Sequence, residues 1–179
     1  DELITTRVTS HIALRNVADA IDIDGVVNAI KLANDTLISA GTTRPRIGVA
    51  ALNPHAGDDG NFGTEEIDIL APAIEKARRL QIDVDGPWPS DTVFLRGRDG
   101  KLDAVVTMYH DQGQIAMKMM GFDRGVTIAA GLPVPVATPA HGTAFDIAGK
   151  GVANLNATRK AFDILCRMGL NFRRSRMVA

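Results

Sequence analysis

Residues 103–120 read DAVVTMYHDQGQIAMKMM, and this stretch decides the fold class. Its first part, 103–109, is a short run of apolar and β-branched residues, which is typical of a strand buried on both faces of a sheet. The run passes directly through His110 into a helical pattern over about 112–120. A buried strand that leads straight into a helix indicates an α/β protein with a parallel sheet.

The rest of the chain repeats this alternation of strand and helix. We expect strands over 3–9 and 46–52, an extended stretch over 126–136, and helices over 26–38, 64–80 and 156–168. Gly41 and Gly169 follow two of these helices and are expected to stop them. The pattern predicts an α/β fold whose mostly parallel sheet is flanked by helices.

Composition excludes several classes of protein. The 179 residues are 45% hydrophobic and 23% charged, with 20 Lys+Arg against 21 Asp+Glu. These are values of a globular domain, so disorder, collagen and coiled coil are excluded. The near-neutral charge argues against nucleic acid or a membrane surface as a partner, because no excess of basic residues exists to neutralise phosphates. No apolar run approaches the roughly 20 residues needed to cross a bilayer.

Two features concern the cellular setting and the extent of the chain. Cys166 is the single cysteine, so no internal disulfide can form, which predicts a location in the reducing cytoplasm. The chain starts at Asp1 and reads as a strand almost at once. We therefore expect it to be an incomplete part of a larger subunit, with an N-terminal part, and some of the active site, absent.

Three of the four histidines lie at or just after the end of a predicted strand. They are His11, His55 and His110. Because the carboxyl ends of parallel strands meet at one edge of a sheet, these imidazoles could converge there and ligate a divalent metal. Histidines so far apart form no local motif, so the alternative of three unrelated structural histidines stays open at this point.

Two carboxylates accompany these histidines. Asp111 adjoins His110, and Asp91 lies in the segment Pro89–Thr92. Either could orient a ligand imidazole or handle a proton. The common alternative for such residues is the cap of a turn or helix.

Two glycine-rich segments could approach a ligand closely. The backbone N–H groups of loop 53–64 could cradle an anion, although Asp58 and Asp59 oppose a phosphate and the glycines fit a tight turn equally well. Residues 141–154 read HGTAFDIAGKGVAN, with small residues and an aspartate suited to ribose hydroxyls. This second segment lacks the GxGxxG fingerprint, so it does not predict the usual Rossmann site.

The segment 141–154 resembles the NAD-binding loop of the isopropylmalate and isocitrate dehydrogenases. Most of the remaining chain resembles one relative of these enzymes, the 4-hydroxythreonine-4-phosphate dehydrogenase family of vitamin B6 biosynthesis. The resembling stretches occur in the family's order and are Thr9–Ile21, Leu52–Gly57, Phe62–Ile67, Gly86–Thr92 and Met108–Gly113. The resemblance implies an isopropylmalate-dehydrogenase-like fold, with residues 1–179 as the C-terminal portion of a two-domain subunit.

The resemblance also implies a metal site. In that family three histidines bind a catalytic divalent metal, and the site is completed across a homodimer interface. These histidines correspond to His11, His55 and His110. Imidazole ligands suit zinc best, with cobalt, nickel, manganese or magnesium as further options.

Substrate and cofactor residues follow from the same resemblance. The lysine that contacts the substrate corresponds to Lys118, with Asp91 and Asp111 as further catalytic candidates. Asp146 is expected to hold the adenosine ribose, and its charge favours NAD over NADP. The other expected cofactor-binding residues are His141, Gly142, Thr143, Ile147 and Asn154.

Two positions depart from the family's pattern. An asparagine and an arginine that contact substrate in the family are replaced by Thr127 and Val136. Loss of the arginine removes a fixed cation and up to five hydrogen-bond donors. The substrate could therefore lack the phosphate and be a carboxylated cis-dihydrodiol, as in the degradation of terephthalate.

The sequence as a whole predicts an enzyme that uses NAD and a divalent metal to oxidise and decarboxylate a small hydroxy acid. The phosphorylated hydroxythreonine and the non-phosphorylated dihydrodiol are competing substrates. A non-catalytic metal- or nucleotide-binding domain is the alternative from another class. Homodimerisation is expected, with the active site at the interface.

Overall fold

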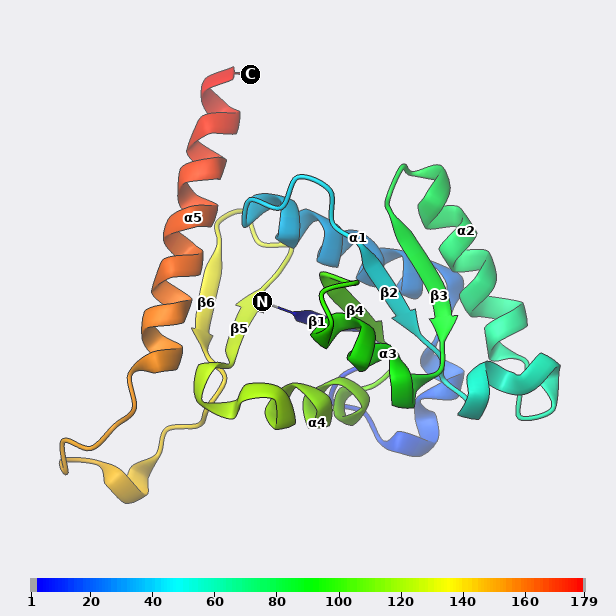
Figure 1. Ribbon diagram of the computed structural model, residues 1–179, viewed down its shortest axis with the longest axis horizontal. Helices are drawn as coiled ribbons and strands as arrows, with labels where there is room; N and C mark the ends of the chain where they lie inside the picture. Colours follow the sequence, from blue (N-terminus) through cyan, green and yellow to red (C-terminus); the bar gives the residue numbers. More distant parts are fainter. Residues whose placement is uncertain (1–2, 179) are drawn as a thin grey trace. The chain divides into compact units, whose positions relative to one another are not determined.

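The computed structural model describes residues 3–178, with side chains for all of these except residues 122 and 174–178 (Figure 1). The described residues form two compact units. The first unit comprises the described part of Asp1–Ile38 together with Thr42–Ala116, and the second comprises Ser39–Gly41 and the described part of Met117–Ala179. Each unit is considered by itself below.

The first unit is built on a four-stranded sheet in which every neighbouring pair of strands is parallel. The strand order is β1-β4-β2-β3. The strands are β1 (Ile4–Arg7), β2 (Ile47–Ala50), β3 (Val84–Trp88) and β4 (Ala104–Thr107). All residues of β2 and β4 are buried, as the apolar runs predicted. The predicted α/β class with a parallel sheet is therefore confirmed.

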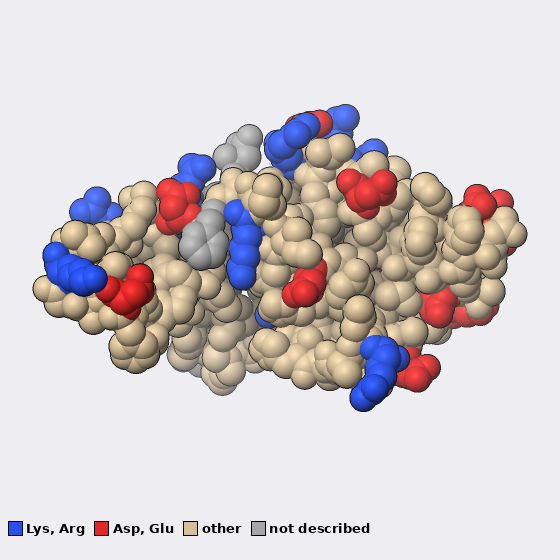
Figure 2. Space-filling model, turned by 90° about the horizontal axis from the view of Figure 1, so that it is seen from below, with Lys and Arg blue, Asp and Glu red and all other residues tan. Residues whose placement is uncertain are grey.

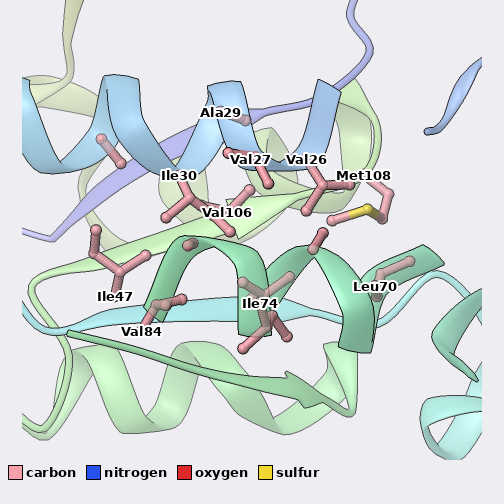
Figure 3. Close-up of a cluster of buried hydrophobic side chains, with 14 of the residues drawn as sticks. Val26, Val27, Ala29, Ile30, Ile47, Leu70, Ile74, Val84, Val106 and Met108 are labelled. Carbon is pink, nitrogen blue, oxygen red and sulfur yellow. The ribbon is translucent and has the colours of Figure 1, made fainter. Parts of the chain in front are cut away.

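Helices cover both faces of this sheet. α1 (Ile23–Ser39) and α2 (Ala71–Arg79) pack on one face, where Ile30 and Ile74 meet Ile47 and Val106 in the larger core cluster (Figure 3). α3 (Ser90–Arg98) packs on the other face through a smaller cluster that contains Val93 and Val105. Successive strand residues thus point to opposite helical layers, which explains why these strands are apolar throughout.

The sequence analysis did not predict β3 and α3. The strand carries Gly86 and Pro87, which read as turn residues in a sequence. β3 is at an edge of the sheet, where a missing N–H is tolerated. A side chain at Gly86 would come within 2.6 Å of the carbonyl oxygen of Val49, so glycine is required by the neighbouring strand.

Two helices differ in detail from the expected ones. The predicted helix over 64–80 is observed as a π-helical turn, η4 (Glu66–Leu70), followed by α2. Pro72 has no N–H for an α-helical bond to the carbonyl of Asp68, which fits a wider turn at this point. α4 (His110–Gly121) begins at His110, slightly earlier than predicted.

The second unit contains an antiparallel hairpin and a long helix. β5 (Val126–Ala129) pairs with β6 (Val136–Pro139), so the extended stretch expected over 126–136 is two strands with Pro133 and Pro135 in the connection between them. α5 (Asn156–Val178) continues through Gly169, so the expected stop there is wrong. Its buried residues Ala157, Ala161, Ile164 and Met168 repeat at helical spacing, and packing along that face outweighs the roughly 1 kcal/mol cost of an internal glycine.

Short helical turns connect these elements, among them η1 (Leu14–Asn16), η2 (Ala18–Ala20) and η5 (Phe122–Arg124). Among the described residues, no helix combines the length and apolar character needed to span a membrane.

Candidate functional site

The carboxyl edge of the parallel sheet collects the predicted site residues of the first unit. His11 follows β1, His55 follows β2, Asp91 follows β3, and His110 follows β4. This placement agrees with the expectation drawn from the strand ends. In open α/β sheets, ligands bind at this edge.

His11 and His110 lie side by side at this edge. Their ring centroids are 5.5 Å apart, and the ring planes are tilted by 43°. Two imidazoles that bind one tetrahedral cation at about 2.0 Å from each nitrogen have centroids about 5 Å apart. The spacing of this pair therefore fits two ligands of a single divalent metal.

Asp111 holds the imidazole of His110 in one orientation. The His110 Nδ1 atom lies 2.7 Å from the Asp111 carboxylate, so Nδ1 donates this hydrogen bond when the ring is neutral. The Nε2 lone pair then remains for a ligand. A carboxylate that orients a histidine in this way is the common outer partner of a metal-binding imidazole.

His55 occupies an unusual backbone segment and does not join the other two histidines. The turn η3 (Pro54–Gly60) has positive φ at every residue from His55 to Asp59, including 53° at His55 itself. His55 is exposed and contacts Phe62, with ring centroids 6.1 Å apart. Within the described residues of this chain, no group of three or more His, Cys, Asp or Glu side chains converges on a metal position.

A buried carboxylate that the sequence analysis missed anchors the chain entering this turn. Glu66 is 3% exposed, and its Oε1 accepts hydrogen bonds from the backbone N–H groups of Leu52 and Asn53 at 2.8 and 2.7 Å. Its Oε2 accepts another from Asn53 Nδ2. These bonds help to offset the cost of left-handed backbone, about 1–2 kcal/mol for each non-glycine residue. The only sequence signal was an acid at a helix start, which normally indicates an exposed residue.

The structure favours a tight turn over an anion cradle for loop 53–64. The N–H groups at its entrance already bind Glu66, so an internal carboxylate occupies them. The loop fits the alternative of a tight turn with positive φ, since Gly57, Gly60 and Gly63 all have φ between 80° and 124°.

Asp91 and Lys118 lie on helices and are exposed. Asp91 is in the first turn of α3, directly after Ser90. Lys118 is in the last turn of α4, in the second unit, on the same helix that begins with His110. Both side chains are open to solvent and could reach a substrate.

The expected cofactor residues form an exposed stretch of the second unit before α5. Ala144 has a left-handed φ of 49°, and the turn η6 (Phe145–Ile147) presents Asp146. The side-chain oxygen of Asn154 accepts a hydrogen bond from the N–H of Asn156 and so caps α5. His141 Nδ1 lies 2.9 Å from the carbonyl oxygen of its neighbour Gly142. The exposed carboxylate of Asp146 could accept hydrogen bonds from ribose hydroxyls, as the expected cofactor role requires.

Thr127 and Val136 lie on the same face of the hairpin. Thr127 pairs with Thr138, and Val136 pairs with Ala129. Cross-strand partners and alternate residues of a strand share a face, so these four side chains point the same way. All four are exposed, and none carries a charge.

Charge over the surface follows the balanced composition. On the face shown in Figure 2, Lys and Arg side chains are interspersed with Asp and Glu instead of gathering in one area. In the described part of the chain, several basic residues are paired, as Arg46 is with Asp103 and Lys76 is with Asp24.

Comparison with protein families identifies the family of this chain. Residues 1–165 match the family model "Pyridoxal phosphate biosynthetic protein PdxA". The chain belongs to this family. It is 61% identical over 171 residues to a protein of Pseudomonas aeruginosa named "Putative 4-hydroxythreonine-4-phosphate dehydrogenase 2", covering 94% of this chain and 51% of the relative. It is 50% identical over 153 residues to the D-threonate 4-phosphate dehydrogenase of Pectobacterium atrosepticum, covering 86% of this chain and 47% of the relative.

Solved structures agree with this assignment. The crystal structure of 4-hydroxythreonine-4-phosphate dehydrogenase from Klebsiella pneumoniae has a TM-score of 0.75 at 43% identity, covering 94% of this chain and 49% of that one. A terephthalate 1,2-cis-dihydrodiol dehydrogenase from Burkholderia xenovorans LB400 has the same TM-score at 30% identity, with 92% and 52% covered. The chain thus spans about half the length of the relatives it matches. The PdxA relatives are oxidoreductases by name.

Proposed function

We propose that the protein containing this chain is an NAD- and divalent-metal-dependent dehydrogenase that oxidises and decarboxylates a small phosphorylated hydroxy acid. 4-Hydroxythreonine 4-phosphate and D-threonate 4-phosphate are the substrates named for its relatives. The observation that carries the proposal is the His11–His110 pair, 5.5 Å apart, with Asp111 holding His110 by Nδ1. The cytoplasmic location stays a prediction based on the single cysteine.

In this proposal His11 and His110 hold a divalent cation, and zinc is the ion that their imidazoles suit best. When bound, the cation would supply Lewis acidity to the substrate's hydroxyl and carbonyl oxygens. Asp111 keeps His110 in the tautomer that presents Nε2. Lys118 pairs with an anionic group of the substrate, and Asp91 is a candidate to accept the hydroxyl proton.

The proposed reaction has two stages. The substrate hydroxyl loses its proton, and the carbon that carries this hydroxyl gives up a hydride, which NAD would accept when bound. The resulting keto acid then loses carbon dioxide as the bond to its carboxylate breaks. The electron pair of that bond stays on the substrate as an enolate, which takes up a proton. Asp146, with His141, Gly142, Thr143, Ile147 and Asn154 nearby in sequence, binds the cofactor in this proposal.

The third histidine comes from a second copy of the chain in this proposal. His11 and His110 are neighbours, whereas His55 joins no group of three ligands among the described residues of one protomer. In a symmetric dimer, each protomer can give His55 to the site of its partner. The left-handed turn leaves His55 exposed, as such an exchange between protomers requires.

Mixing two inactive variants tests this arrangement. A random mixture of His55→Ala and His110→Ala protomers forms some heterodimers with one intact site, so about a quarter of the parent activity should return. The matched mixture of His11→Ala with His110→Ala should recover nothing, because both residues belong to the same protomer. Recovery in the second mixture but not in the first would overturn the proposed sharing.

A second candidate substrate is favoured by one specific observation. The exposed hairpin face with Thr127 and Val136 carries no cation that could meet a phosphate. A non-phosphorylated, carboxylated cis-dihydrodiol would not need one. Its decarboxylation would also be driven by formation of an aromatic ring.

The formation of NADH from each substrate decides between the candidates. The purified protein is supplied with NAD, a divalent metal and either D-threonate 4-phosphate, 4-hydroxythreonine 4-phosphate or the terephthalate dihydrodiol. A higher kcat/KM for a phosphorylated acid supports the first candidate, and a higher value for the dihydrodiol supports the second. Metal and NAD binding without turnover of any of them would favour a non-catalytic binding domain instead.

A further inference from the structure

A chain of hydrogen bonds crosses the carboxyl edge of the sheet in the spatial order of the strands. Thr9 Oγ1, after β1, donates to the carbonyl oxygen of Met108, after β4, at 2.8 Å. The Met108 N–H donates to Gln112 Oε1 at 2.7 Å, and Gln112 Nε2 donates to the carbonyl oxygen of Ala51, after β2, at 2.8 Å. The same Nε2 also donates to Ser90 Oγ, after β3, at 2.9 Å, and Ser90 Oγ in turn donates to the carbonyl oxygen of Ala51 at 2.6 Å. We call these five residues the edge belt.

Gln112 is the central member of the edge belt. Its carboxamide hydrogen-bonds to the ends of two neighbouring strands, accepting from Met108 after β4 and donating to Ala51 after β2. Met108 is fully buried, so its N–H has no solvent to replace the glutamine. The approach of α4 to the sheet is also close: a side chain at Gly113 would lie 3.1 Å from Thr107 Oγ1.

Both histidines of the proposed metal pair lie within two residues of the edge belt in the sequence. His11 is two residues beyond Thr9, and His110 lies midway between Met108 and Gln112. The Gln112 bonds therefore tie the first turn of α4, which carries His110, to the end of β2. Loss of these bonds would remove that tie.

We infer that Gln112 is a positioning residue for the metal site: its carboxamide fixes the first turn of α4 so that His110 stays at ligating distance from His11. This inference rests on the proposed function, because it assumes that the two histidines bind a metal. In this inference Gln112 acts through His110 and is not itself a metal ligand. A glutamine is suited to this task because it donates and accepts at the same time without adding charge to the site.

Cobalt binding tests the inference without depending on turnover. Co²⁺ is titrated into the purified metal-free protein, and its visible absorption reports the affinity and the ligand geometry. Gln112→Leu keeps the approximate size of the side chain but removes both hydrogen-bonding groups, and we expect about a tenfold or greater loss of Co²⁺ affinity with an altered spectrum. Gln114→Leu is the matched control, since Gln114 lies on the same helix and its side chain makes no hydrogen bond to any residue that the structure describes. This control should bind Co²⁺ within twofold of the parent.

Measurements are made at a temperature where circular dichroism shows each variant folded. If Gln112→Leu fails to fold, Gln112→Glu takes its place: it keeps the acceptor for Met108 but sets a carboxylate oxygen against the carbonyl oxygen of Ala51. A folded variant with lower thermal stability but unchanged Co²⁺ affinity and spectrum would overturn the inference and leave Gln112 a purely structural residue. His110→Ala separates the two proposals. If it binds Co²⁺ like the parent, the metal pair itself is wrong, whereas loss there with no loss at Gln112 refutes only the positioning role.

Discussion

The strands of the two units differ in how deeply their residues are buried. In the first unit, every residue of β2 and β4 is buried, because helices cover both faces of the parallel sheet. In the second unit, β5 and β6 alternate between half-buried and exposed residues. A sheet covered on both faces can place function only at its edge, which is where His11 and His110 meet. A hairpin with one open face can present substrate-selecting side chains directly on that face.

The largest effect is expected at the edge of the first unit. His110→Ala removes one of two adjacent imidazoles, and metal-dependent NADH formation should fall on the order of 10³-fold because several kcal/mol of charge stabilisation depend on the metal. Steady-state kinetics with added divalent metal measures this. Full turnover by a folded His110→Ala protein would refute the ligand assignment.

Packing in the two units can be compared with a pair of isoleucines. Ile74 is 1% exposed in the larger core cluster of the first unit, and Ile164 is 8% exposed on α5 of the second. Ile74→Ala should lower the free energy of unfolding by about 3–5 kcal/mol, and Ile164→Ala by about 2 kcal/mol, since fewer atoms surround the second side chain. Urea denaturation of both variants gives the two values. Equal losses would show that the second unit is packed as tightly as the first.

A smaller effect, a change in substrate preference, is expected at the open hairpin face. Val136→Arg restores a cation on the face that carries Thr127, and kcat/KM for a phosphorylated acid should rise about tenfold relative to the dihydrodiol. Val134→Arg is the control, because Val134 is also exposed but lies in the connection between the strands. An equal gain from both arginines would indicate a general effect of charge and not a contact made by residue 136.

The smallest effect is expected at the end of the sheet opposite to the histidines. The guanidinium of Arg46 hydrogen-bonds to Asp103 and lowers the pKa of that carboxyl below its ordinary value of 3.8. A lowered pKa in the folded state adds stability that is fully present above pH 3.8 and is lost as the pH falls through the folded-state pKa. Asp103→Asn should therefore reduce the melting temperature at pH 7, and the gap to the parent should narrow below pH 3.8.

Thermal melts from pH 7 down to pH 3 measure that gap. Asp83→Asn serves as the control, because its partner Arg44 is 84% exposed and the pair is longer, at 3.3 Å. A gap for Asp103→Asn that stays constant over the whole range would mean that the charge of the carboxylate is not the source of its contribution.

Prediction from the sequence succeeded where local pattern and burial point the same way. The apolar runs over 46–52 and 103–109 predicted buried strands, and helical spacing over 26–38 predicted α1. It failed where tertiary context overrides local preference. β3 holds a glycine and a proline that an edge strand tolerates, and α5 continues through Gly169 because its packed face extends along the helix.

The sequence by itself determined the fold class, the family and the position of three histidines at the ends of strands, since these depend on residue order and on the two-residue and 3.6-residue periods of strands and helices. Only the tertiary structure decided which histidines are neighbours, because that depends on the strand order β1-β4-β2-β3, which no local pattern encodes. The same is true of Glu66 beneath the left-handed turn and of Gln112 across the edge belt. Their hydrogen bonds join segments that are remote in the chain and meet only when the sheet has formed.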